Sequence, residues 1–233
     1  MGLEKQLRIY CFNEGRVDSI LIGCDGKWMF IDGGYRKNGL SAIKKMKALG
    51  VTKLDAYCIS HCHKNHLDAG VPIIHQMKPN IVYANRDIAR TTLLKYAKGE
   101  SEKEAVNRAK ISVLAPGDTF SLGNATFACI GPLKLKGCNA GAYAENSNSL
   151  ILRMSYGKRT ALFTGDTTGA ILSAISKYYS LDVEVLKNAH HGARLDESVL
   201  KRITPQITAI CNGSPPSPAY KKRLTKIGSK VFA

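Results

Sequence analysis

Long apolar segments are absent from this chain of 233 residues, and no run approaches the roughly 20 apolar residues that a bilayer crossing needs. The stretch from Met1 to Gln6 also lacks the apolar core of a signal peptide. Cysteine occurs seven times, an odd number, and never as a Cys-x-x-Cys pair, which argues against a disulfide framework. These absences predict a cytoplasmic protein with free thiols and no membrane partner.

Acidic residues are scarce as well. The chain has 18 Asp and Glu against 34 Lys and Arg, so its formal net charge is +16. This excess favours polyanionic partners, either nucleic acid or phosphorylated substrates, although a basic surface can also serve solubility alone. From Ser198 to Ala233 there is no acidic residue, and the stretch carries seven basic ones: Lys201, Arg202, Lys221, Lys222, Arg223, Lys226 and Lys230. Such a segment is compatible with phosphate binding but does not identify the polyanion.

Internal repeats and low-complexity linkers are also missing. Hydrophobic content of 44% and charged content of 22% are ordinary for a globular protein, and the length suits one domain over residues 1–233. Apolar periodicity and turn signals predict alternating strands and helices. Strands are expected at 7–12, 18–22, 27–31, 54–60, 81–84, 111–114, 125–130, 149–154, 160–164, 183–186, 206–211 and 230–232. Helices are expected at 38–49, 67–77, 87–98, 101–110, 169–179, 197–203 and 218–227, with a loop at 134–144.

Histidine is scarce but clustered. Three of the six histidines, His61, His63 and His66, fall within six positions, directly after a predicted strand. Side chains at i and i+2 of an extended segment point the same way, so His61 and His63 project together, and His66 enters from the following helix. Three converging imidazoles suit a divalent transition metal. Chance clustering is the alternative, and the rarity of histidine disfavours it.

Two further strand ends carry similar groups. His190 and His191 follow one predicted strand, and Asp166 follows another in Thr164-Gly165-Asp166. Strand ends that converge on one sheet edge are where α/β sites form. A carboxylate between two groups of imidazoles can bridge two cations about 3.5–4 Å apart, as two-metal hydrolytic sites require. Taken alone, Thr164-Gly165-Asp166 is more simply a helix cap and His190-His191 a surface loop. Asp32, before Gly33-Gly34, is either a site-supporting residue or a turn former.

The ordered set of motifs resembles a known family. Ser60-His61-Cys62-His63-Lys64-Asn65-His66 resembles the His-x-His-x-Asp-His signature of the metallo-β-lactamase fold. The other segments resemble the branch that contains the hydrolase domain of the DNA-uptake protein ComEC and small stand-alone relatives: Ile31 to Gly34, Glu145 to Leu150, Phe163 to Asp166 and Leu186 to Gly192. The resemblance implies an α/β protein built as a four-layer αββα sandwich with a metal site.

The resemblance also implies roles for individual residues. His61 and His63 would hold the first metal, Asp166 would bridge, and His66 with one histidine of the 190–191 pair would hold the second. We expect His190 to be that ligand and His191 to contact the substrate, although the reverse order stays open. Asn146 occupies the place where other branches supply a histidine and is expected to face the site. The expected cofactors are two divalent metals, zinc or manganese.

One residue departs from the family pattern in a way that affects the chemistry. Asn65 stands where the family has an aspartate that binds the second metal and orients the attacking water. A neutral amide is a poorer ligand, so the second metal site should be weakened. Asn65 could be an engineered inactivating change, a natural feature of an enzyme that uses one metal, or the mark of a lapsed site. We favour the first because the other ligands are in place.

Charge and resemblance together predict a metal-dependent phosphodiesterase. A metal-activated water would attack phosphorus, and the cations, with His191 or nearby lysines, would offset the developing charge. The substrate would be nucleic acid or a small nucleotide such as a cyclic mononucleotide. Two alternatives remain: a non-catalytic binding protein for nucleic acid or nucleotide, and an esterase for non-nucleotide substrates. Related proteins are often dimers, so a homodimer is also open.

Overall fold

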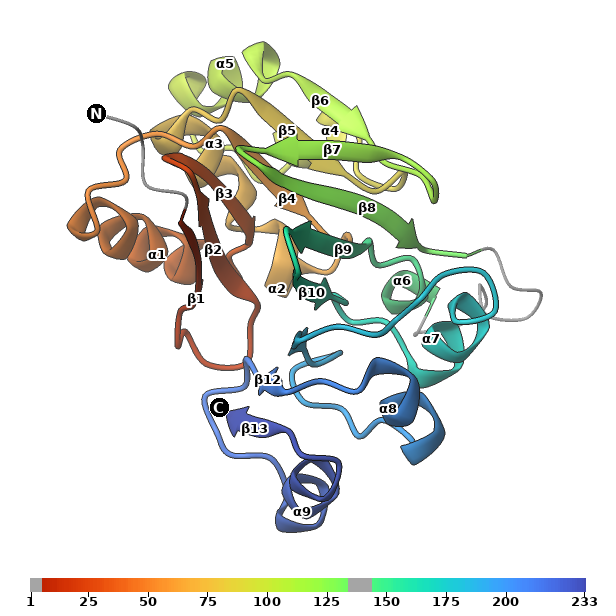
Figure 1. Ribbon diagram of the computed structural model, residues 1–233. Coiled ribbons are helices and arrows are strands. Elements are labelled where there is room, and N and C mark those ends of the chain that lie inside the picture. Colours follow the sequence, from red (N-terminus) through yellow and green to blue (C-terminus); the bar gives the residue numbers. More distant parts are fainter. Residues whose placement is uncertain (1–5, 134–143) are drawn as a thin grey trace.

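The computed structural model describes residues 6–133 and 144–233, and its strands form two sheets (Figure 1). In the first sheet six strands lie in chain order, with β1 to β3 antiparallel and β3 to β6 parallel. These are β1 (Leu7–Cys11), β2 (Ser19–Cys24), β3 (Lys27–Asp32), β4 (Ala56–Ile59), β5 (Ile81–Ala84) and β6 (Ile111–Val113).

The second sheet repeats this plan. Its seven strands also lie in chain order, β7 to β10 antiparallel and β10 to β13 parallel. They are β7 (Thr119–Leu122), β8 (Ala125–Gly131), β9 (Ile151–Tyr156), β10 (Arg159–Phe163), β11 (Val185–Lys187), β12 (Ile207–Ala209) and β13 (Lys230–Phe232). Each sheet therefore begins as a meander and ends in parallel strands joined by helical crossovers.

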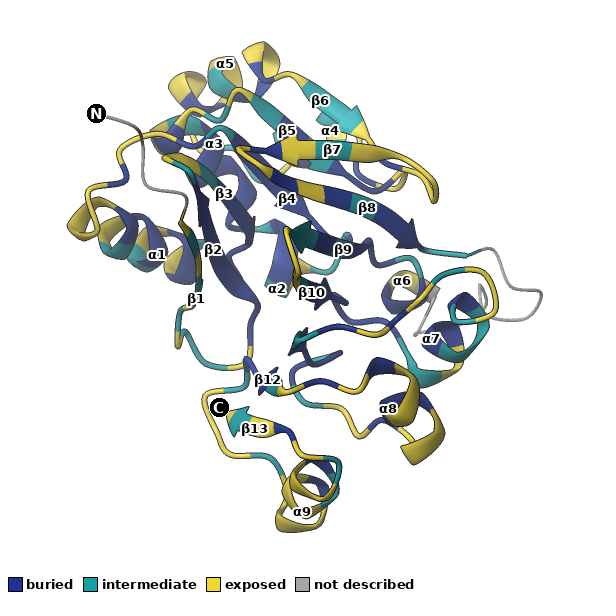
Figure 2. Ribbon diagram, in the orientation of Figure 1, coloured by how far each residue is buried: buried dark blue, intermediate teal, exposed yellow. Residues whose placement is uncertain are grey.

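Helices cover the outer face of each sheet. The described helices are α1 (Arg36–Ala48), α2 (Lys64–Leu67), α3 (Gly70–Met77), α4 (Arg90–Leu94), α5 (Glu100–Arg108), α6 (Ala144–Ser147), α7 (Gly169–Ile175), α8 (Glu197–Ile203) and α9 (Pro218–Lys226). The first five contribute to the side of the first sheet, and α7 to α9 pack on the second. Figure 2 shows buried strands inside and exposed helix faces outside.

Alternation along the strands explains why both sides of a sheet are apolar. In β2 every residue is buried. Leu21 packs toward the helices of the first sheet, while Ile20 and Ile22 pack between the sheets with Phe127 and Leu152 of the second. Successive strand side chains point to opposite faces, so a continuous apolar run is what a strand covered on both faces requires. The expected αββα sandwich is confirmed.

Some helices differ from the sequence-based expectation. The helix expected at 87–98 is only the five residues of α4, because the Asn85 side chain accepts a hydrogen bond from the Asp87 backbone N–H and Ala89 is extended. The helix expected at 67–77 is divided, and α2 already begins at Lys64, so His66 lies within it. Most of the loop expected at 134–144 lies outside the described residues. None of the helices in the described part of the chain combines the length and apolar character of a membrane crossing.

The topology brings four strand ends together. Within each sheet the parallel strands all end at the same edge. The carboxyl ends of parallel strands from both sheets meet at the site. The segments that carry the polar motifs follow these ends at Asp32 of β3, Ile59 of β4, Phe163 of β10 and Lys187 of β11. The site is thus assembled from two strands of each sheet.

The opposite end of β2 and β3 is held by Asp25. Its carboxylate accepts hydrogen bonds from the backbone N–H of Gln6 (3.0 Å), the backbone and side-chain amides of Asn124 (3.0 and 2.7 Å) and the Tyr156 hydroxyl (2.9 Å). Asn124 belongs to the β7–β8 turn and Tyr156 ends β9. One carboxylate therefore ties a turn of the first sheet to two elements of the second.

Asp25→Asn should lower stability in a pH-dependent way. Desolvation raises the pKa of Asp25, but the hydrogen bonds outweigh it and lower the pKa from 3.8 to about 2. Because the folded pKa is depressed, the carboxylate stabilises the fold above the unfolded pKa, and this contribution is lost as the pH falls toward about 2. The difference in Tm between parent and variant should be largest near neutral pH and should close in acid. Asp196→Asn, at an exposed site, is the charge-matched control. If the difference in Tm between parent and variant stays the same at acidic pH, the Asp25 carboxylate does not stabilise the fold in this way.

Candidate metal centre

Four imidazoles surround one buried carboxylate at the edge where the strands end. His61 lies two residues after the end of β4, and His66 lies in α2. Asp166 follows β10, and His191 follows β11. His61, His66, Asp166 and His191 are all buried, with at most 3% of each residue exposed. His63, the N-cap of α2, is partly exposed. Polar side chains this deeply buried require partners, and here they partner one another.

Their donor atoms form two groups. The first contains His61, His63 and Asp166, and the second contains His66, Asp166 and His191, with the donor atoms of each group within 4.8 Å of one another. His61 Nε2 lies 3.0 Å from His63 Nδ1 and 4.0 Å from Asp166 Oδ2. The second group is tighter: Asp166 Oδ2 lies 3.3 Å from both His66 Nε2 and His191 Nε2.

Asp166 is shared by both groups. Its Oδ1 atom is buried and has no hydrogen-bond partner among the described residues, so this carboxylate has unused acceptor capacity. Neutral imidazole nitrogens with a carboxylate oxygen are the donor set that zinc, manganese and iron accept. The residues present therefore fit divalent-metal binding, and Asp166 could contribute to either group.

Each of these four imidazoles is supported from behind. A histidine that binds a metal through one ring nitrogen generally donates a hydrogen bond from the other, which fixes its orientation. The partners are Ser60 Oγ for His61 Nδ1 (3.0 Å), Glu145 Oε2 for His63 Nε2 (2.6 Å) and Asp32 Oδ2 for His66 Nδ1 (2.8 Å). Asp18 Oδ1 lies 3.3 Å from His191 Nδ1 as an ion-pair contact without hydrogen-bond geometry. In all four rings the other nitrogen faces the common centre.

His190 does not share this arrangement, contrary to the expectation that it, rather than His191, is the ligand. Its Nε2 lies 3.7 Å from Asp166 Oδ2, its side chain is 30% exposed, and among the residues described no further carboxylate or hydroxyl supports its ring. Both residues have left-handed backbones, with φ of 46° at His190 and 53° at His191. This turn sends His191 inward and leaves His190 at the surface of the site, so the geometry favours the reverse order.

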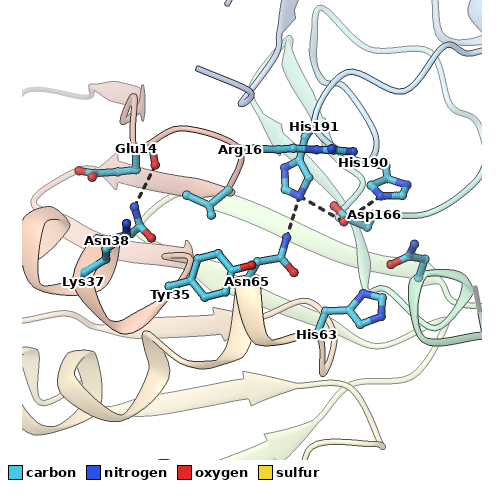
Figure 3. A pocket seen from close by; sticks show the side chains of 12 residues that line it. Glu14, Arg16, Tyr35, Lys37, Asn38, His63, Asn65, Asp166, His190 and His191 are labelled. Atoms are coloured by element: carbon cyan, nitrogen blue, oxygen red, sulfur yellow. Dashed lines mark hydrogen bonds and ion pairs between the residues drawn. The ribbon is translucent and has the colours of Figure 1, made fainter. Parts of the chain in front are cut away.

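Asn65 and Asn146 both reach the site. Asn65 Nδ2 lies 3.1 Å from His191 Nε2, beside the second donor group. Asn146 is 3% exposed, and its Oδ1 has no hydrogen-bond partner within the described segments. Both line a cavity of about 460 Å³ that opens above the donor groups (Figure 3). The remaining lining residues are Glu14, Arg16, Val17, Tyr35, Lys37, Asn38, His63, Asp166, His190 and His191.

Asp32 has the supporting role that the sequence left open. Besides His66, its carboxylate accepts hydrogen bonds from the backbone N–H (2.7 Å) and hydroxyl (2.8 Å) of Ser60. Its own backbone is left-handed, with φ of 59°. For a non-glycine residue this conformation is uncommon and is often found at functional sites. Asp32 thereby orients the segment that carries His61 as well as the ring of His66.

A buried ion pair beside the site was not foreseen. Lys187 donates to the Asp18 carboxylate and to the carbonyl of Gly165 (3.1 Å), and the side chains of Lys187 and Asp18 are 2% and 1% exposed. The sequence placed Asp18 only at the start of an expected strand, and Lys187 only within the Leu186 to Gly192 motif, directly after the strand expected at 183–186. A charged residue within or next to an otherwise apolar strand is the signal that could have identified them, since buried charges need partners.

The electrostatics of the centre favour positive charge. Burial lowers the pKa of His66, but the carboxylates of Asp32 and Asp166 outweigh burial and raise it to about 10. Burial raises the pKa of Asp166, yet nearby His66 and His191 hold it far below its usual range. His61 has a pKa well below 6.5, chiefly because it is buried. The carboxylates thus create a place where a cation is stabilised.

Comparisons with known proteins identify the architecture. No family model and no curated protein matches the chain. Among solved structures, a candidate metal-dependent hydrolase from Parabacteroides distasonis is 13% identical, with a TM-score of 0.60 and 97% of both chains covered. The metallo-β-lactamase fold protein YhfI from Bacillus subtilis is 14% identical, with a TM-score of 0.60 over 97% of this chain and 93% of that one. A diphosphatase of the PhnP family is 13% identical, with a TM-score of 0.56 over 93% and 81%.

These identities are low while the coverage is nearly complete, so the likeness concerns the backbone arrangement. This chain folds into two sheets with helices on their outer faces, and the candidate site lies at the ends of their strands. The protein has the metallo-β-lactamase fold.

Proposed function

We propose that this protein is a metal-dependent hydrolase that cleaves phosphodiesters at the strand-end site. The observation that carries the proposal is the sharing of Asp166 by two groups of donor atoms. His61, His63 and Asp166 would hold one metal, and His66, Asp166 and His191 the other. Bound divalent metals would supply Lewis acidity and a water that is nucleophilic at neutral pH.

The chain's own residues would position the substrate. His190 lies at the cavity surface and can donate a hydrogen bond to a phosphoryl oxygen, so it takes the substrate-contacting role first expected of His191. The amide of Asn146 is buried at the cavity wall, where it can orient a bound group. Asn65, beside His191, adds a neutral hydrogen-bonding group in place of a carboxylate.

Two observations support a phosphodiester as the substrate. The net charge of +16 favours anionic ligands, and Arg16 lies in the cavity wall near His190. One structural neighbour is a diphosphatase of the PhnP family. The fold alone does not decide the substrate, because unrelated activities share it.

His61→Ala should abolish metal-dependent hydrolysis of bis-p-nitrophenyl phosphate, with a loss on the order of 100-fold or more because one of three donors of the first group is removed. The assay would compare chain loaded with Mn²⁺ or Zn²⁺ with chelated chain. His75→Ala is the matched control, since His75 lies in α3 and lines a separate cavity. Equal rates in the two variants, or a parent rate independent of metal, would contradict the proposal.

A non-catalytic binding protein is the second candidate, and Asn65 is the observation that favours it. Without a carboxylate at this position the second group has only two imidazoles and the shared Asp166. If the parent binds both metals yet leaves phosphodiesters intact, and Asn65→Asp is equally inert, binding without cleavage is the better description.

A further inference from the structure

The outer wall of the cavity carries three side chains that the proposed chemistry does not use. Arg16 comes from the connection between β1 and β2, and Tyr35 and Lys37 come from the start of α1. Figure 3 shows Arg16 extending toward His190 above the centre, with Tyr35 on the facing side beside Asn65. All three are exposed residues that line the same cavity as the donor groups.

The charge of this wall is not balanced by the protein. Within the described ranges, neither Arg16 nor Lys37 takes part in an ion pair. Glu14, the acidic residue of the lining besides Asp166, is engaged elsewhere: its carboxylate accepts hydrogen bonds from Lys45 (2.7 Å) and Ser41 (2.9 Å), and its side chain is 7% exposed. Arg16 lines the same cavity as His190 and extends toward it (Figure 3), which places its charge close to the metal-binding groups. An anionic group entering the cavity would meet two uncompensated cations.

Tyr35 adds a flat apolar surface. It is 42% exposed, and it is the extended N-cap residue of α1, with φ of −70° and ψ of 164°. An exposed aromatic ring beside a cationic groove is the arrangement on which nucleobases stack. The wall therefore offers complementary surfaces for a planar ring and for a phosphate.

The two segments that carry these residues are held together. The Asn38 side-chain amide donates to the Glu14 carbonyl (2.9 Å), which joins α1 to the β1–β2 connection. Gly34 has a left-handed φ of 83°, and a Cβ there would lie 2.8 Å from the Val17 side chain. Only glycine permits this close approach, so the wall is preorganised rather than formed by separate mobile segments.

We propose that Arg16, Tyr35 and Lys37 form a subsite for a second phosphate and a nucleobase of the substrate. The inference rests on the proposed function and makes it more specific. A substrate that fills this subsite carries a phosphate in addition to the one cleaved, as in a nucleotide chain, whereas a cyclic mononucleotide has a single phosphate. The cavity of about 460 Å³ is within the range of small-ligand sites, so the subsite addresses the nucleotide next to the cleaved bond.

Binding to the metal-free chain tests the subsite without any catalysis. The probe is thymidine 3′,5′-bisphosphate, measured by calorimetry against thymidine 5′-monophosphate. Arg16→Ala should weaken binding of the bisphosphate by about tenfold or more, since a charge-assisted hydrogen bond contributes roughly 1.5–3 kcal/mol and 1.4 kcal/mol is tenfold. Lys37→Ala and Tyr35→Leu should each weaken it by several-fold. The controls are Arg8→Ala in β1 and Lys47→Ala in α1, both exposed and outside the cavity.

The second part of the test measures turnover of two substrates. Thymidine 5′-(p-nitrophenyl phosphate) would be compared with the same ester carrying a 3′-phosphate, using Mn²⁺-loaded chain. In the parent the 3′-phosphate should raise kcat/KM by about tenfold, and in Arg16→Ala this ratio should fall toward one, because binding energy of a remote group raises kcat/KM.

The outcomes separate this inference from the proposed function. If no phosphodiester is cleaved but the bisphosphate binds through Arg16, the function fails and the subsite stands. If bis-p-nitrophenyl phosphate is cleaved but the bisphosphate binds no better than the monophosphate, the subsite is wrong. Equal weakening by Arg8→Ala and Arg16→Ala would also overturn it, since the effect would then be one of net charge.

Discussion

Asn65→Asp should tighten binding of the second divalent metal by at least about tenfold and raise metal-dependent phosphodiester hydrolysis by a similar or larger factor. The Asn65 side chain lies 3.1 Å from His191 Nε2, at the edge of the donor group formed by His66, Asp166 and His191. A carboxylate there adds a negative charge and a metal-binding oxygen in a side chain of the same shape. An amide supplies neither the charge nor comparable ligand strength.

The measurement is metal stoichiometry and affinity, followed by turnover of bis-p-nitrophenyl phosphate. The parent should bind one Mn²⁺ or Zn²⁺ tightly and a second weakly, whereas the variant should bind both. Asn80→Asp is the matched control, because Asn80 is exposed and lies in the wall of a different cavity. If Asn65→Asp changes neither stoichiometry nor rate, the amide belongs to the native chemistry of this site.

Local sequence patterns predicted most of the donor groups. The spacing of His61, His63 and His66 and their place after a strand were enough to bring the three rings together, because strand periodicity and a helix start fix their directions. Asp166 was recognised in the same way, as a carboxylate at a strand end. The fold followed from the alternation of strands and helices together with the resemblance of the ordered motifs.

The order of His190 and His191 could not be read from the sequence. Which ring turns inward depends on two successive left-handed residues, and nothing in the side-chain pattern specifies that backbone conformation. The helix expected at 87–98 is shorter than predicted for a related reason, because the side chain of Asn85 competes for backbone hydrogen bonds. Both differences come from local backbone geometry that apolar periodicity does not encode.

The support of the centre comes largely from one hairpin. Ser19 pairs with Asp32 across β2 and β3, and Asp18 immediately precedes Ser19, so the two carboxylates emerge at the same end of the hairpin. Asp32 orients His66 and Asp18 faces His191. The second donor group is therefore held by adjacent carboxylates of the first sheet. This relation was invisible to local patterns because Asp32 and His66 are 34 residues apart in the chain, and Asp18 and His191 belong to different sheets.

Asp18→Asn should be among the most destabilising single substitutions, with a loss of about 3–5 kcal/mol in the free energy of unfolding. The side chain of Lys187 is 2% exposed and ion-paired with Asp18, and the paired carboxylate raises the pKa of the lysine against the opposing effect of burial. An asparagine removes the direct counter-charge of the buried ammonium, which keeps only a hydrogen bond to the Gly165 carbonyl and the attraction of the Asp166 carboxylate, with which no ion pair is formed. Since globular proteins are stable by only about 5–15 kcal/mol, such a loss should be plain in urea unfolding.

Comparison of variants separates the ion pair from its effect on the metal centre. The double variant Asp18→Asn with Lys187→Met should recover much of the lost stability, because no buried charge is then unpaired. It should not recover the second metal, since His191 still lacks its carboxylate, and a lost supporting group weakens metal binding by roughly 10–100-fold. Lys27→Met is the surface control: its pair with Asp55 is 3.1 Å long but the lysine is 57% exposed, so the expected cost is at most about 1 kcal/mol. If Asp18→Asn unfolds at the same urea concentration as the parent, the pair does not stabilise the fold. If its second metal is also retained, Asp18 does not orient His191.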